Sequence, residues 1–164
     1  MSEPPASLTS LVATALDELR AGAALLRSSQ VAFAARPTLA SNTRWFMRLF
    51  VLRRGMSQTS EAELFWANLE GARDRCTASD AALAQLFAEH ASNPAIARLQ
   101  GQLNDLGQAE IIPALNQDVE PGEEAQASER LEPVVARMKV CEGRLLAAIQ
   151  AVASQSSEDG ADPD

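Results

Sequence analysis

The residues in this chain with the clearest potential for chemistry are one histidine, His90, two cysteines, Cys76 and Cys141, and a pair of arginines four residues apart. A zinc site built on His90 would need Cys or acidic partners at chelating spacing, and no C-x-x-C motif occurs. A carboxylate-bridged di-iron centre needs a Glu-x-x-His motif on each of two helices, which one histidine cannot supply. The sequence therefore predicts no metal and no cofactor.

The sequence also contains no motif that indicates a catalytic site. Counting residues does not exclude a Ser-His-Asp triad, but no G-x-S-x-G motif is present and no strand is predicted to carry one. The context FAEHASNP places His90 at a helix end, where a simple hydrogen bond is its expected role. Cys76 and Cys141 occupy apolar positions and are expected to be buried thiols. No catalytic residue is predicted, and the chain leans towards a non-enzyme.

The arginine pair, Arg44 and Arg48, belongs to a cationic segment, TRWFMRLFVLRRG, which runs from Thr43 to Gly55 and contains no acidic residue. The chain has 14 basic and 22 acidic residues, so without the four arginines of this segment the balance is 10 − 22 = −12. Such segregation of charge indicates a docking element. The predicted interaction surface consists of Arg44, Trp45, Phe46, Arg48, Leu49, Phe50, Arg53 and Arg54.

Several roles are open to the cationic segment. It could pack beneath the other helices, with its arginines reaching their acids. It could bind a partner or a second copy, because Trp, Phe, Met and Arg are enriched in interface cores. It could also lie on an anionic lipid layer or an apolar granule. Arg44 and Arg48 could cradle a phosphate, although no glycine-rich loop accompanies them. We favour a protein partner, because the surrounding negative charge would repel an anionic membrane.

Composition limits the class of protein. A chain of 164 residues suits one domain with a sizeable core. The acidic balance argues against nucleic-acid binding, and no apolar run approaches the roughly 20 residues of a spanning helix. Without a recognisable export signal, the expected location is the cytoplasm. The excess of arginine over the single Lys139, together with abundant alanine, suggests a GC-rich bacterial genome.

Apolar residues recur every three or four positions along almost the whole chain, which predicts an all-α protein. The first helix is expected from about residue 7 to Phe33, before Arg36-Pro37. The cationic segment is expected to form a separate short helix, capped by Ser41 and ended by Arg53, Arg54 and Gly55.

Three longer helices should follow. A capping box of Ser60 and Glu63 predicts the start of a helix that reaches about Glu89 without a break at 78–80. Pro94 should begin the next helix, which should kink or end near Pro113. Residues 118–124 should form a turn whose acids are solvated. The final helix should carry 131–152, with Pro133 either starting its regular part or bending it.

These expectations combine into an antiparallel bundle of four long helices with a short inserted amphipathic helix. The domain should cover 7–154, between flexible tails at 1–6 and 155–164. The predicted function is that of a non-enzymatic cytosolic interaction protein, an adaptor, regulator or chaperone-like module that forms a homo-oligomer. One alternative is a peripheral protein on a lipid or granule surface. Another is a small-ligand binder or enzyme with a site between helices near Arg44, Arg48 and His90.

Overall fold

The computed structural model describes the backbone of residues 7–34 and 46–158, and the side chains of 7–30 and 61–154. The described residues are helical and contain no strand, which confirms the all-α prediction. The elements are α1 (Leu8–Ala34), α2 (Phe46–Glu89), α3 (Pro94–Asp105), the 3-10 helix η1 (Gln108–Glu110), α4 (Ile111–Leu115), α5 (Glu124–Arg130) and α6 (Glu132–Glu158).

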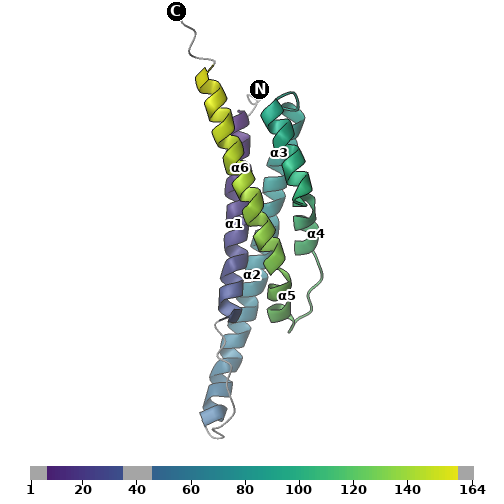
Figure 1. Ribbon diagram of the computed structural model, residues 1–164. Coiled ribbons are helices and arrows are strands. Elements are labelled where there is room, and N and C mark those ends of the chain that lie inside the picture. The colour runs from purple at the N-terminus through teal and green to yellow at the C-terminus, as the bar shows by residue number, and fades with distance from the viewer. Residues whose placement is uncertain (1–6, 35–45, 159–164) are drawn as a thin grey trace, which may run out of the picture.

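The long helices lie side by side in an elongated molecule (Figure 1). Helix α1 contacts both α2 and α6, and α3 contacts α6 and, less extensively, α2. Neighbouring helices run in opposite directions, and the start of α1 lies near the same end of the molecule as the end of α6 (Figure 1). The core between them is filled by fully buried apolar side chains, among them Val12, Phe65, Leu69, Leu86, Leu99, Met138 and Leu145.

Two buried polar contacts join α1 to α2. The Ser79 hydroxyl donates to the carbonyl oxygen of Ala15 at 2.7 Å. The Asn68 amide donates to the Ser29 hydroxyl at 3.1 Å. All three of these polar side chains are buried. Because a buried polar group without a partner destabilises the fold by roughly 1 to 3 kcal/mol, these contacts disfavour any sliding of one helix along the other.

A glycine allows the two helices to approach closely. Gly22 of α1 is buried, and a Cβ atom at this position would lie 3.1 Å from Sγ of Cys76 and 3.4 Å from the carbonyl oxygen of Ala72. Both neighbours belong to α2. Met138 of α6 closes the site from the other side, with its terminal methyl at 3.4 Å. The absence of a side chain at Gly22 therefore sets the spacing of α1, α2 and α6.

The prediction of a separate short helix is wrong. The chain is helical without interruption from Phe46 to Glu89, through Gly55 and through the supposed capping box of Ser60 and Glu63. A glycine inside a helix costs only about 1 kcal/mol relative to alanine, and arginine is a good helix former, so these signals weaken a helix without ending it. The predicted continuity through 78–80 is confirmed. Ser41 lies outside the described residues.

The helix that begins at Pro94 ends earlier than predicted, at Asp105. Gly107 adopts a left-handed conformation with φ of 68°, which breaks the helix before η1. Pro113 instead lies in the first turn of α4, where its missing N–H is tolerated. The final helical region is divided at Leu131, and Pro133 lies in the first turn of α6, so the proline starts the regular part of that helix.

The tight contact at Gly22 yields a stability prediction. Gly22→Leu should destabilise the protein by at least about 1 to 3 kcal/mol, the usual range for overpacking, because the new side chain meets backbone and sulfur. The matched variant Gly143→Leu lies in α6 with open space around its Cβ position. It should be neutral or stabilising by up to about 1 kcal/mol. Chemical unfolding of both variants measures the difference, and equal stabilities would contradict the described packing.

Candidate functional site

Helix α2 is much longer than the helix that pairs with it. Ser79 lies opposite Ala15, and Asn68 lies opposite Ser29. Continued in the same antiparallel register, this pairing places the end of α1, Ala34, level with about residue 61 of α2. Residues 46–60, here named the α2 extension, therefore project about 22 Å beyond α1, at roughly 1.5 Å per residue. Figure 1 shows the extension below the ends of α1 and α5.

The α2 extension contains most of the predicted interaction surface. The helical backbone of the extension includes Phe46, Arg48, Leu49, Phe50, Arg53 and Arg54, whose side chains lie outside the described part of the structure. Arg44 and Trp45 lie outside the described residues altogether. Among the helices that the structure describes, none runs beside this part of α2 (Figure 1).

The sequence changes character where the extension meets the bundle. Residues 57–60 are Ser, Gln, Thr and Ser, with no apolar side chain among them. From Phe65 onwards the inward face of α2 is apolar and buried. Between these two stretches Leu64 is 47% exposed. The apolar part of the cationic segment is thus separated from the core by a polar stretch.

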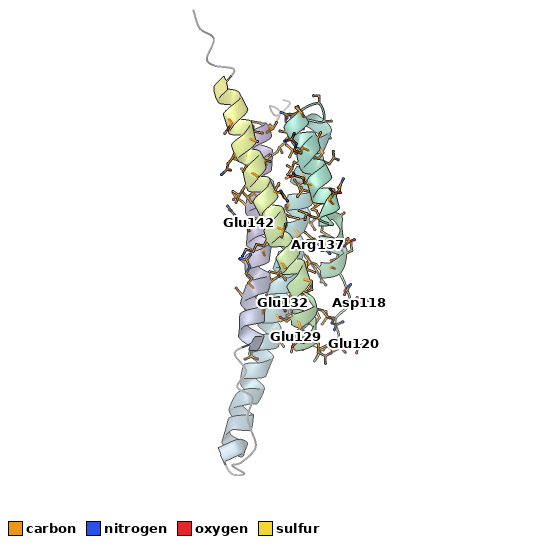
Figure 2. All side chains as sticks on the ribbon, viewed as in Figure 1. Asp118, Glu120, Glu129, Glu132, Arg137 and Glu142 are labelled. Atoms are coloured by element: carbon orange, nitrogen blue, oxygen red, sulfur yellow. The ribbon has the colours of Figure 1, made fainter. Side chains whose placement is uncertain are left out.

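Negative charge gathers at the end of the bundle from which the extension projects. Four exposed carboxylates, here named the acidic end, lie in the loop between α4 and α5 (Asp118 and Glu120), in α5 (Glu129) and at the start of α6 (Glu132). Figure 2 shows all four near this end of the molecule. No ion pair with a described residue engages them. The sequence marks the acids of 118–124 as a solvated turn, whereas no motif marks Glu129 and Glu132.

One acid of this loop is not solvated, contrary to the prediction. Glu124 is only 8% exposed. Its carboxylate accepts a hydrogen bond from the Trp66 indole N–H at 3.1 Å and another from the backbone N–H of Gly122 at 3.0 Å. Gly122 has φ of 100°, a conformation that glycine adopts readily. Glu124 therefore fastens the acidic loop to α2, and Glu123 is held by Arg130 at 3.5 Å.

A small cavity opens beside the acidic end. Its volume is about 70 Å³, and its wall combines Asp118 and Arg130 with apolar side chains from α2, α4, the loop, α5 and α6. The apolar members include Leu69, Leu115, Val119, Leu131 and Val134. The cavity at this end of the bundle is therefore mainly apolar, with one acid, Asp118, and one base, Arg130, in its wall.

Cys76 and Cys141 are free and buried, as predicted. Both contribute to the wall of one cavity of about 10 Å³, too small for a ligand. Burial raises the pKa of the Cys76 thiol to about 12. Burial also raises the pKa of Cys141, although the Arg137 charge opposes the shift. Both thiols are therefore protonated at neutral pH, which makes them poor nucleophiles.

His90 lies at the C-terminal end of α2, as predicted, but its Nε2 atom is buried without a hydrogen-bond partner. The expected hydrogen bond is therefore missing at that nitrogen. Within 7–30 and 61–154, no three His, Cys, Asp or Glu side chains are grouped as a metal site would need. The described helices include none with both the length and the apolar character of a membrane span.

No family model, curated protein sequence or solved structure that we compared with this chain gives a significant match.

The buried thiols predict a loss of stability in alkali. Because the folded pKa of Cys76 is raised from 9.0 to about 12, its contribution is fully present below about pH 9 and is lost as the pH rises towards 12. The slope should reach about 1.4 kcal/mol per pH unit for one thiol. The chain has no tyrosine, and Lys139 is the only lysine, so few other side chains titrate in this range.

Urea unfolding between about pH 8.5 and 10.5, on the wild type and on Cys76→Ala, tests this expectation. The variant should show a shallower decline of stability with pH, whatever its stability at neutral pH, because only Cys141 then remains as a buried thiol. Identical slopes would show that Cys76 does not keep its proton in the folded state.

Proposed function

We propose that this chain is a non-enzymatic interaction protein that binds a second copy of itself through the α2 extension. In this proposal the remaining helices form an antiparallel four-helix scaffold that holds the extension in place. The observation that carries the proposal is the register of α1 and α2, which leaves residues 46–60 of a single continuous helix beyond the end of the bundle.

The composition of the extension supports a docking role. A helix surrounded by water is usually polar over most of its surface, whereas residues 46–52 of this one are six apolar residues and Arg48. Large apolar groups interspersed with arginine are typical of interface cores. Their burial against a partner would stabilise the complex by roughly 25 cal/mol per Å² of apolar surface.

Charge supports self-association over an unrelated partner. The extension carries Arg48, Arg53 and Arg54 and no acid before Glu61, whereas the acidic end lies on the same chain near the base of the extension. In a dimer with twofold symmetry, each copy can offer its extension to the acidic end of the other. The cavity of about 70 Å³ beside the acidic end offers apolar surface for a side chain of the extension.

The acidic end also weighs against the lipid alternative. A membrane that attracts the arginines of the extension would meet Asp118, Glu120, Glu129 and Glu132 at its base, and the chain as a whole has a net charge of −8. Electrostatic attraction to anionic headgroups adds about 1 kcal/mol for each nearby basic residue, and nearby acids oppose it. A protein partner, unlike an anionic membrane, can present acidic groups to the extension and basic groups to the acidic end.

Two phenylalanines on the same helix provide a matched test of docking. Phe50→Ala should leave the free energy of unfolding of the dilute protein nearly unchanged and should weaken self-association, because none of the described helices runs beside the extension (Figure 1). Phe65→Ala removes a core side chain that is 1% exposed and should cost about 3 to 5 kcal/mol of stability. Chemical unfolding and sedimentation velocity measure the two effects. A loss of stability in Phe50→Ala as large as in Phe65→Ala would place the extension in the core.

A charge exchange tests the proposed partner surface. One variant carries Arg48→Glu and Arg53→Glu, and the other carries Glu129→Arg and Glu132→Arg. Each variant should be monomeric alone, because the extension of one copy and the acidic end of the other would then carry charges of the same sign. An equal mixture should form a heterodimer, since both of its contacts again pair opposite charges. Sedimentation of the mixture measures this directly.

Three results would contradict the proposal. If the wild type is monomeric at every concentration, or if the mixed variants stay monomeric, the extension does not bind the acidic end of a second copy. If the wild type instead co-sediments with anionic vesicles at physiological salt, and Arg48→Glu with Arg53→Glu abolishes this, the lipid alternative is correct.

A further inference from the structure

Two arginines of the bundle have no ion-pair partner among the described residues. Arg98 of α3 and Arg144 of α6 are exposed and line one groove between these helices. Neither forms an ion pair with a described residue. Neither has a carboxylate three or four residues away on its own helix, because those positions hold Pro94, Ala95, Gly101 and Gln102 for Arg98, and Val140, Cys141, Ala147 and Ala148 for Arg144. Several other arginines of the bundle are paired, such as Arg20 with Glu142 at 2.7 Å.

The groove has a volume of about 190 Å³, and each of its two walls is formed by residues from one helix. On α3 these are Ala95, Arg98, Leu99 and Gln102, and on α6 they are Arg144, Ala147, Ala148 and Ala151. Both sets repeat at i, i+3, i+4 and i+7, so each forms one face of its helix. Val140, which is 47% exposed, lies four residues before Arg144 and extends the face on α6.

The chemistry of the walls selects a helical occupant. Both walls are α-helices, whose backbone groups already bond within each helix, so the groove offers its occupant no backbone donors or acceptors. An extended peptide placed on the alanine methyl groups would leave its own N–H and C=O groups unpaired. A helix satisfies its backbone internally, and the small alanine side chains allow it to approach closely.

Charge selects the side chains of that helix. The chain has a net charge of −8, so most of its surface would repel an acidic partner. In the groove, carboxylates of the occupant would instead meet the unpaired guanidinium groups of Arg98 and Arg144. We propose that the α3–α6 groove binds an acidic amphipathic helix of a protein partner, with small apolar residues facing the alanines and carboxylates facing Arg98 and Arg144. This site is independent of the α2 extension.

The test uses the full chain and a pair of synthetic helical peptides. The acidic probe is a stapled helix of about 18 residues, long enough to be helical, with an alanine and leucine stripe flanked by glutamates. Its twin has lysine at every glutamate position. Fluorescence anisotropy should show the wild type binding the acidic probe at least about tenfold more tightly than the twin.

Three variants assign the binding to the groove. Arg98→Glu with Arg144→Glu should reverse the preference between the two probes. The control, Arg27→Glu with Lys139→Glu, changes the net charge equally at exposed positions outside the groove and should leave the affinity for the acidic probe within about twofold. Ala147→Trp, at an exposed position in the groove, should block both probes without lowering the melting temperature.

The inference fails if the wild type does not bind the acidic probe at about 1 mM, or if the groove and control variants bind it equally. It also fails if Arg98→Glu with Arg144→Glu alters the oligomeric state while the control does not, because the groove would then be a contact between copies of this chain.

Discussion

The fixed register of α1 against α2 is the constraint on which the rest of this structure depends. The Ser79 hydroxyl at the Ala15 carbonyl and the Asn68 amide at the Ser29 hydroxyl are buried contacts between the two helices. A slide by one helical turn would separate both pairs in an apolar interior, where unpaired polar groups are costly. Because the register is fixed and α2 is longer than α1, part of α2 has to project beyond the end of α1. The projecting part is the α2 extension.

The same register organises the interior of the bundle and the end from which the extension projects. It brings Gly22 against Cys76 and Met138, which fixes the distance of α6 from α1 and α2. It also places Trp66 where its indole can hold Glu124, so that the loop between α4 and α5 returns to the base of the extension. The backbone of the α2 extension, whose sequence is basic, and the acidic end of the bundle therefore belong to different elements of one chain. The proposed contact between copies rests on this arrangement, because each copy would carry both halves of a complementary surface.

The sequence predicted the helices better than their ends. Burial follows the apolar period, so the all-helical class, the buried cysteines and the start of α3 at Pro94 were predictable. The signals at Gly55 and Ser60 resemble helix ends, but each alters helix stability by only about 1 kcal/mol, which helical neighbours on both sides outweigh. Glu124 was misjudged because its partner, Trp66, is distant in sequence. Arg98 and Arg144 had no motif and became notable only when the fold placed them in one groove.

Amide hydrogen exchange along α2 tests the central claim most directly. In the dilute monomer, amides of 65–86, which pack against α1, should exchange only on global unfolding. Those of 48–60 should exchange orders of magnitude faster, because no described helix runs beside this part of α2 (Figure 1) and an unsupported helix frays readily. Raising the protein concentration should then slow exchange in 48–60 as the copies associate. Equal, strong protection of both segments in the dilute monomer would show that the extension is packed within the fold, and would contradict this account.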